Sequence, residues 1–171
     1  DDANGFIDDV HGWSSISNSS EPTDHHGHGT HVAGTIAASG NNGRGVIGMS
    51  WTAKVMAVQG LNASGFGSSS GLVSAILYAA ENGADVISNS WIGFRGPVAT
   101  DPISDAIATA RALGAVVVAA AGNSGVDLRL SAFPATVYFP AGVEGVITVG
   151  ASSADDSVAG FSNYGRGLSV S

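Results

Sequence analysis

The chain has 171 residues, of which 44% are hydrophobic and only 12% are charged, so it is long and apolar enough to build the core of one domain. Its net charge of −8 and its six basic residues exclude a nucleic-acid-binding surface, because phosphate recognition needs clustered Lys and Arg. Cysteine is absent and no apolar run approaches the length of a membrane span, which excludes disulfides, thiol chemistry and a membrane-spanning helix.

The first segment of the chain, residues 1–9, is acidic. It holds four carboxylates and an asparagine around a glycine. Hard cations prefer such oxygen ligands, and a glycine lets a loop turn around the ion. The segment therefore predicts either a calcium site or an acidic loop in contact with solvent. The candidate calcium ligands are Asp1, Asn4, Asp8 and Asp9.

Four of the five histidines fall within residues 25–31. They stand just before the small-residue run Val32–Ala38, which predicts a helix with His28 at or near its N-terminus. The positive end of the helix dipole disfavours an imidazolium there, and a neutral imidazole is what a general base requires. The spacing of His26, His28 and His31 also permits a zinc metallohydrolase, although the aspartate of that pattern is missing and no further histidine follows.

Four short apolar runs recur about every 30 residues, which is the repeat length of a βαβ unit. Each run is apolar almost throughout, and this favours strands that are buried on both faces of a parallel sheet. The predicted strands are Lys54–Val58, Asp85–Asn89, Ala115–Ala121 and Gly145–Gly150.

Helical segments lie between these strands. One is predicted over Ser70–Glu81, because Asn82-Gly83 forms a stop signal. Another is predicted to begin at Asp101-Pro102 and to end at Leu113-Gly114, since Pro is favoured in the first turn. The alternation predicts a three-layer α/β domain in which helices flank a mostly parallel sheet.

The strand predicted over Ala115–Ala121 runs directly into Gly122-Asn123-Ser124-Gly125. Sites in parallel sheets form at the carboxyl ends of strands, where an asparagine amide can donate a hydrogen bond to a developing oxyanion. The same residues also fit an ordinary turn. A separate run, Gly67–Gly71, formally matches a nucleophile elbow, but no strand leads directly into it and no histidine follows it. A loop that caps the next helix explains its serines better.

Several of these segments resemble the subtilisin-like serine proteases, or subtilases. His28–Gly34 is similar to the histidine motif of that family, Ala120–Gly125 to its oxyanion-asparagine motif, and Asp85–Trp91 to its substrate-binding strand. The resemblance covers nearly the whole chain, because further landmarks follow in the family's order: Phe133–Ala135, Val146–Ala151 and Phe161–Gly165.

The resemblance implies roles for individual residues. His28 would be the catalytic base, His31 a packed structural histidine on the same helix, and Asn123 the donor of an oxyanion hole. Subtilases usually have a small residue where Ile92 stands, so its bulk is expected to narrow the primary pocket or to shift the strand. The pocket walls are apolar, and we expect apolar or aromatic side chains on the acyl side of the cleaved bond. The implied substrate-binding residues are Ser90, Trp91, Ile92, Gly93, Ala120, Ala121, Gly122, Gly65, Phe66 and Gly67.

The resemblance also implies a second candidate calcium site. The corresponding loop of subtilases wraps a calcium ion with one asparagine side chain and several backbone carbonyls. Here the ligands would be the Asn42 side chain and the carbonyls of Gly40, Arg44 and Val46.

Two motifs of the family are absent from the chain. No Asp-Thr-Gly, Asp-Ser-Gly or Gly-Thr-Ser-Met-Ala sequence occurs, so the resemblance implies that the catalytic aspartate lies upstream of Asp1 and the nucleophilic serine downstream of Ser171. We interpret the chain as an internal part of one catalytic domain, with a fold incomplete at both ends and no activity by itself. The parent would be a secreted, monomeric serine endopeptidase that acts on polypeptides and binds its own propeptide. The alternative is a non-catalytic binding or structural module of the same family.

Overall fold

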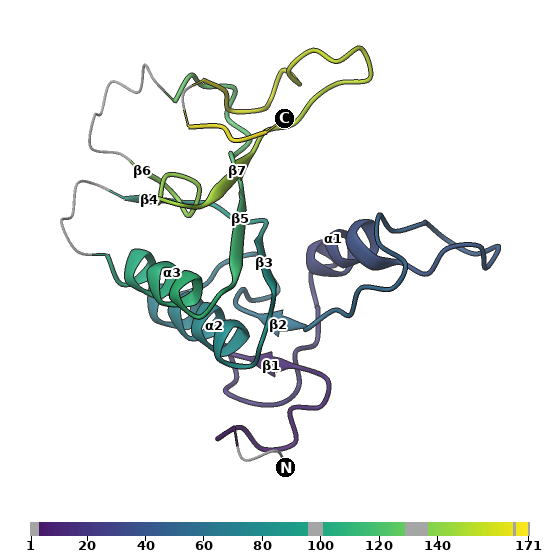
Figure 1. The fold of residues 1–171 in the computed structure, drawn as a ribbon, viewed down its shortest axis with the longest axis vertical. Helices are drawn as coiled ribbons and strands as arrows, with labels where there is room; N and C mark the ends of the chain where they lie inside the picture. The colour runs from purple at the N-terminus through teal and green to yellow at the C-terminus, as the bar shows by residue number, and fades with distance from the viewer. Residues whose placement is uncertain (1–3, 96–100, 129–136, 166, 171) are drawn as a thin grey trace. The chain divides into compact units, whose positions relative to one another are not determined.

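The computed structural model describes residues 4–95, 101–128, 137–165 and 167–170. The chain divides into two compact units, Asp1–Asn82 and Gly83–Ser171, and the elements of both are labelled in Figure 1. No helix among the described residues combines the length and the apolar character needed to cross a bilayer.

The first unit is built around a short parallel pair of strands and one long helix. β1 (Trp13–Ser14) pairs with β2 (Val58–Gln59), and α2 (Ser69–Glu81) contacts both strands. The core of the unit is aromatic: the ring of Tyr78 lies 4.8 Å from that of Phe6 and 6.0 Å from that of Trp13. The strand predicted over Lys54–Val58 is wrong in its extent, because its partner β1 offers only two residues for pairing and pairing begins at Val58.

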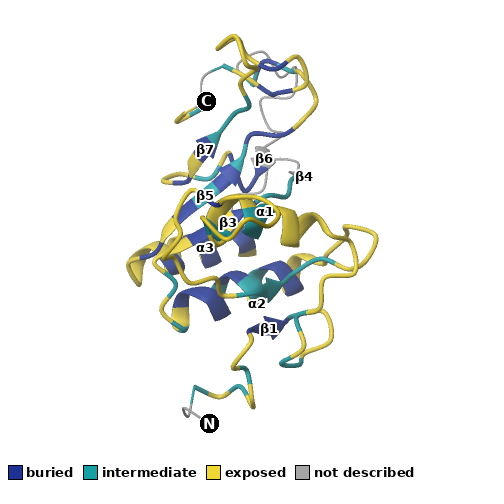
Figure 2. Ribbon diagram, turned by 90° about the vertical axis from the view of Figure 1, so that its right-hand side faces the viewer, coloured by how far each residue is buried: buried dark blue, intermediate teal, exposed yellow. Residues whose placement is uncertain are grey.

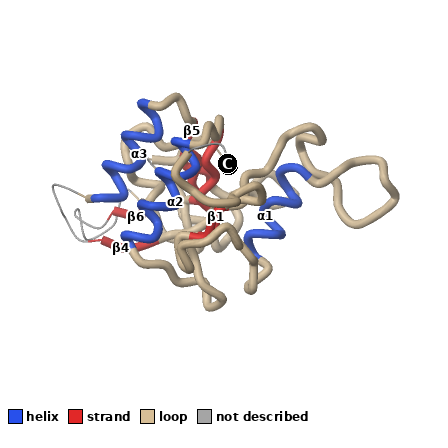
Figure 3. The backbone as a smooth tube through the Cα atoms, turned by 90° about the horizontal axis from the view of Figure 1, so that it is seen from below, coloured by secondary structure: helices blue, strands red, loops and turns tan. Residues whose placement is uncertain are grey.

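α1 (His28–Ala37) begins at the residue that the sequence places at the helix N-terminus, so this prediction is confirmed. A segment with neither helix nor strand follows it as far as β2, drawn as loop in Figure 3. No residue of α1 is buried, and the helix is largely in the exposed colour of Figure 2. The expectation of a packed His31 is therefore wrong for this structure: its side chain is exposed, because the helix has no buried face to receive it.

The second unit contains a three-stranded parallel sheet with the order β3-β5-β7. These strands are Val86–Asn89, Val116–Ala120 and Ile147–Val149, and they lie inside three of the predicted runs. α3 (Pro102–Ala112) connects the first two and packs beside β5 (Figure 1). A separate antiparallel pair, which the sequence analysis does not predict, joins β4 (Gly93–Arg95) to β6 (Val137–Phe139).

Within the second unit, burial differs between the two faces of the parallel sheet. Ile87, Val117 and Thr148 are buried, whereas Val86 is 58% and Val116 44% exposed. Among the described residues of this unit, α3 is the helix that packs on the sheet. Because α3 covers one face of this sheet, buried and more exposed residues alternate along the strands, as the colours of Figure 2 show.

Side-chain caps fix the starts of the two predicted helices. The Ser68 hydroxyl accepts a hydrogen bond from the Gly71 N–H at 3.0 Å, which confirms that this serine run caps a helix. The Asp101 carboxylate accepts one from the Ile103 N–H at 2.8 Å, with Pro102 as the first helical residue. The predicted ends are also confirmed: α2 stops before Asn82, and α3 stops before Leu113.

Candidate active site

The candidate base, His28, is placed by a carboxylate that the sequence analysis does not identify. The helix N-cap is Gly27, with φ 89° and no side chain to offer. The carboxylate of Asp24 caps the start of the helix instead. It accepts hydrogen bonds from the N–H groups of His26, Gly27 and Thr30 at 2.9, 2.8 and 2.9 Å. The Thr30 hydroxyl donates a fourth at 2.7 Å. The carboxylate thus joins the loop before His28 to the first turn after it.

These donors change the acidity of Asp24. The backbone N–H of Thr30 contributes most, followed by the Thr30 hydroxyl, and together with the N–H groups of Gly27 and His26 they hold the Asp24 pKa well below its ordinary value. The loop itself is fastened to β2, because the Gln59 amide donates to the Thr23 carbonyl at 2.9 Å. His28 therefore stands on a hydrogen-bonded support although it is an exposed residue.

The histidine cluster does not form a metal site. The rings of His26 and His28 meet edge to face with centroids 6.2 Å apart. Within the described ranges, no three His, Cys, Asp or Glu side chains are placed to share an ion. The described residues therefore offer no set of ligands for the zinc hypothesis.

The loop with Gly65, Phe66 and Gly67 lies beside the histidine segment, within the same unit. A Cβ on Gly65 would come within 3.8 Å of His26 Nε2, and the Phe66 side chain is 73% exposed. Asn62 closes the loop, since its side-chain oxygen accepts from the Phe66 N–H at 3.1 Å. Gly67 has to be glycine, because a Cβ there would collide with the Gly60 carbonyl. The structure thus brings Gly65, one of the three predicted substrate contacts on this loop, close to His26.

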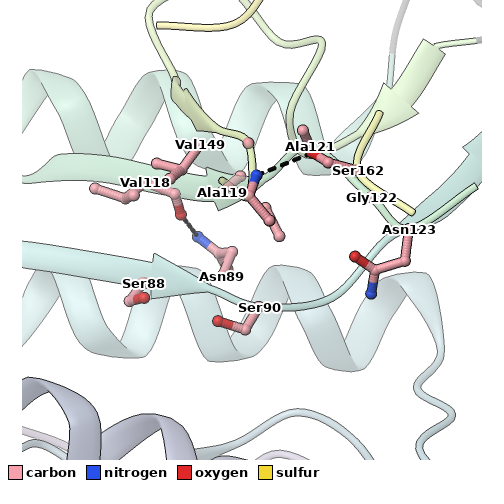
Figure 4. Close-up of a pocket in the computed structure, with 13 residues that line it drawn as sticks. Ser88, Asn89, Ser90, Val118, Ala119, Ala121, Gly122, Asn123, Val149 and Ser162 are labelled. Atoms are coloured by element: carbon pink, nitrogen blue, oxygen red, sulfur yellow. Dashed lines mark hydrogen bonds between the residues drawn. The ribbon is translucent and has the colours of Figure 1, made fainter. Parts of the chain in front are cut away.

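The candidate oxyanion donor, Asn123, lies on a turn directly after β5, in the second unit (Figure 4). The turn begins at Gly122, whose φ of 102° favours glycine, and the Asn123 side chain is exposed. A cavity of about 300 Å³ opens at the carboxyl ends of β3, β5 and β7. The residues that line it are Ser88, Asn89, Ser90, Val118, Ala119, Ala120, Ala121, Gly122, Asn123, Val149, Gly150, Ala151 and Ser162.

Five of the predicted site residues therefore line one cavity: Ser90, Ala120, Ala121, Gly122 and Asn123. Trp91, Ile92 and Gly93 do not line it. Gly93 starts β4 and pairs with Phe139, whereas residues 90–92 lie in no strand of the structure. The Trp91 indole donates to the side-chain oxygen of Asn89 at 3.1 Å.

Ile92 does not line the cavity itself but lies next to Gly122, which does. Its Cδ1 atom is 3.5 Å from the position that a Cβ on Gly122 would occupy. The side chain therefore fills space next to the turn before Asn123. None of the residues that line the cavity carries a charge.

The two candidate calcium segments differ in how their oxygens are used. In the opening segment the Tyr78 hydroxyl and the Asn4 amide donate to Asp9 Oδ2 at 2.6 and 3.0 Å, and they lower the Asp9 pKa, Tyr78 most. The Asn4 oxygen accepts from the Phe6 N–H at 2.8 Å. Asp8 is exposed with φ 56°, and Asp1 lies outside the described residues.

The second segment, residues 40–46, is an exposed turn. The Asn42 side-chain oxygen accepts from the Arg44 N–H at 2.9 Å and therefore faces the backbone of its own loop. Asn41, Gly43 and Gly45 have positive φ values, which give the loop a curved course. In both segments, side-chain oxygens of the candidate ligands accept hydrogen bonds from protein donors.

The three segments that resemble further motifs of the family lie in different parts of the chain's structure. Phe133–Ala135 lies outside the described residues. Val146–Ala151 contains β7 and part of the cavity wall. Phe161–Gly165 lies along the turn that carries Asn123, since Asn163 donates its backbone N–H to the Gly122 carbonyl at 2.9 Å. No role is predicted for Asn163 from the sequence beyond its place in the family motif.

Comparison with known proteins defines the class. The sequence profile of the subtilase family matches residues 1–170. Subtilisin DY of Bacillus licheniformis is 44% identical over 161 residues, which are 94% of this chain and 56% of that protein. A thermophilic serine proteinase of Bacillus sp. (strain AK1) is 40% identical over the same length, or 37% of its own chain. The chain belongs to the subtilase family.

Solved structures agree with this assignment. A cold adapted subtilisin-like serine proteinase superimposes with a TM-score of 0.78 and 30% identity, over 93% of this chain and 53% of that one. A lanthipeptide protease gives a TM-score of 0.79 at 24% identity over 92% of this chain and 45% of its own, which shows the fold alone. The predicted subtilisin-like α/β fold is confirmed. The chain spans between 37% and 56% of the length of the two curated relatives described above.

Proposed function

We propose that this chain contributes the general base and the oxyanion donor of a serine endopeptidase that hydrolyses polypeptides by acyl transfer. One observation carries the proposal: a member of the subtilase family retains His28 as the first residue of α1 and Asn123 on the turn after β5. The aspartate and serine motifs are absent from these 171 residues. The proposal therefore places both groups in further residues of the same protein, and the 171 residues alone are inactive.

In the proposed reaction the serine Oγ bonds to the carbonyl carbon of the scissile peptide, while its proton passes to the imidazole of His28. The carbonyl oxygen becomes an oxyanion, to which the Asn123 amide donates a hydrogen bond. His28 then gives its proton to the leaving amine as the C–N bond breaks, which leaves an acyl-enzyme. Water repeats the sequence, with His28 again as the base, and releases the acid.

Two features of the chain support these roles. Asp24 holds the first turn of α1, which keeps His28 in a fixed position relative to its own helix. The uncharged cavity next to Asn123 supports apolar or aromatic side chains on the acyl side of the cleaved bond. The family also supports a secreted, monomeric enzyme that binds its own propeptide. It further supports a structural calcium ion, for which Asn42 and the carbonyls of Gly40, Arg44 and Val46 would be the ligands.

The test uses the whole protein that contains this chain, a fluorogenic peptide and a fluorophosphonate probe. We expect His28→Ala to abolish turnover, whereas His11→Ala, which removes another exposed histidine, leaves it unchanged. Asn123→Ala should lower kcat by about 100- to 1000-fold, as the loss of one oxyanion donor does elsewhere, with little change in KM. A peptidase whose kcat survives Asn123→Ala contradicts the assignment. A whole protein that lacks both missing motifs and does not react with the probe would favour the non-catalytic module.

A further inference from the structure

We infer that Asn163 is the positioning residue of the oxyanion hole: it holds the turn that carries Asn123, and through that turn it sets the rate of the proposed reaction. The inference rests on the proposed function for its kinetic consequence, but not for its geometry. Asn163 is in the same unit as Asn123 and is completely buried.

The side chain of Asn163 makes a hydrogen bond with each of three residues of the turn. Its oxygen accepts from the Ser124 N–H at 3.0 Å and from the Val126 N–H at 3.2 Å. Its amide nitrogen donates to the Ala121 carbonyl at 2.9 Å. These bonds fasten the turn on both sides of Asn123, while the Asn123 side chain itself stays exposed.

Two backbone hydrogen bonds next to this side chain also hold the turn. Its N–H donates to the Gly122 carbonyl at 2.9 Å, and the N–H of Tyr164 donates to the Val126 carbonyl at 3.0 Å. At Gly122 a Cβ would come within 2.5 Å of Asn163 Nδ2. The amide therefore occupies the space that the glycine leaves open, and a side chain at position 122 would collide with it.

The chemical type of the residue matters for this function. The turn presents two N–H donors and one carbonyl to the same buried point. A single primary amide matches that set, because it can accept two hydrogen bonds and donate one from a planar group. An aspartate has the same size but would put an oxygen against the Ala121 carbonyl.

A displaced turn would act on kcat rather than on substrate binding. The oxyanion exists only after the serine has attacked, so a donor that stabilises it lowers the energy of the transition state. We therefore expect Asn163→Ala and Asn163→Asp to lower kcat by about 10- to 100-fold with KM little changed, since a misplacement of about 1 Å can cost 100-fold.

The experiment is a double-substitution cycle in the whole protein, with Asn123→Ala, Asn163→Ala and both together. If Asn163 acts through Asn123, the second substitution has little further effect on kcat once Asn123 is alanine. If the double variant instead lowers kcat by the product of the two single effects, the inference is overturned. Thr148→Ala is the control, because Thr148 is also buried and its hydroxyl donates to the Ala141 carbonyl at 2.6 Å. It should lower the melting temperature without lowering kcat at a temperature where every variant is folded.

A second readout does not depend on catalysis. The amide hydrogens of Ser124 and Val126 should exchange slowly in the unsubstituted protein and faster in Asn163→Ala, which removes the oxygen that accepts from both N–H groups. The Ala121 amide, which donates to the Val149 carbonyl at 2.8 Å, should keep its protection and serves as the internal reference. Unchanged exchange at Ser124 and Val126 overturns the inference. An inactive protein in which these two amides respond as expected would contradict the proposed function alone.

Discussion

The carboxylate of Asp24 accepts two hydrogen bonds from Thr30, one from its backbone N–H at 2.9 Å and one from its hydroxyl at 2.7 Å. Thr30 lies two residues beyond His28 on the same helix, and Asp24 lies four residues before it. The candidate base therefore lies between two residues that these hydrogen bonds join.

Replacing Asp24 should impair catalysis through His28. We expect Asp24→Ala to loosen the first turn of α1 and to lower kcat in the whole protein, and Asp24→Asn to do so less, since an amide retains one of the two acceptor oxygens. The measurement is kcat together with hydrogen exchange at the Thr30 amide. Asp155→Ala is the matched control, because Asp155 also holds an exposed turn through the N–H and hydroxyl of Ser157. Equal kcat values for both alanine variants would contradict the prediction.

The same contact predicts a pH dependence. The folded-state pKa of Asp24 lies below its ordinary value of 3.8, so the unfolded chain takes up the proton first. The stabilisation is therefore fully present above about pH 3.8 and is lost as the pH falls through the lowered folded pKa. A carboxyl-detected NMR titration should show Asp24 ionised well below pH 3.8. Thr30→Val, which removes one donor, should raise the Asp24 pKa toward its ordinary value, and an unchanged titration would contradict the assigned cause.

Calcium removal should destabilise the whole protein through the loop 40–46. A ligand that binds only the folded state stabilises it by about 2.7 kcal/mol at a hundredfold excess over its Kd, so chelation should lower the melting temperature reversibly. Asn42→Ala should abolish the difference between calcium and chelator. Asp9→Asn should lower the melting temperature equally in both conditions, because Asp9 is bonded to Tyr78 and Asn4. A chelator effect that disappears in Asp9→Asn instead would assign the ion to the opening segment.

The pocket wall predicts a change of specificity at Ile92. Ile92→Ala removes atoms that lie against the Gly122 position and should favour large aromatic residues on the acyl side of the cleaved bond. We expect the ratio of kcat/KM for Phe over Ala substrates to rise about 10-fold or more, since one methylene in an apolar pocket is worth about 1–3 kcal/mol. Val86→Ala, which trims an exposed side chain of the same unit, should leave the ratio unchanged. A ratio equally unchanged in Ile92→Ala would show that Ile92 does not limit the pocket.

Local patterns predict the helices of this chain well. Ser68 and Asp101 are side-chain caps within three residues of the N–H groups that they bind, and such contacts can be read from a short stretch of sequence. The start of α1 at His28 follows from the same reasoning. The supporting residue does not, because Asp24 reaches over Gly27 to Thr30, six residues further along the chain.

Contacts between residues that are far apart in the sequence are not predicted by local patterns. Asn163 bonds to a carbonyl 42 residues away, and nothing near it in the sequence distinguishes a buried amide from an exposed one. β4 and β6 are three residues each and pair across a long separation. The apolar runs predict the strands but not how many faces of the sheet are covered. Val86 and Val116 would belong to the same apolar pattern whether a helix covered them or solvent contacted them.

The hydrogen bond between the Trp91 indole and the Asn89 side chain makes the cavity observable by fluorescence. Asn89 lines the cavity, and Trp91 is one of three tryptophans. Trp13 is buried against Phe6, and Trp51 is 55% exposed. After Trp13→Phe and Trp51→Phe, Trp91 is the tryptophan that remains in these 171 residues, and its emission reports on the cavity. A peptide that fills the cavity displaces solvent around Asn89 and changes the polarity that this indole senses. Peptide binding and release can then be followed by Trp91 fluorescence in the His28→Ala variant, which does not cleave the peptide.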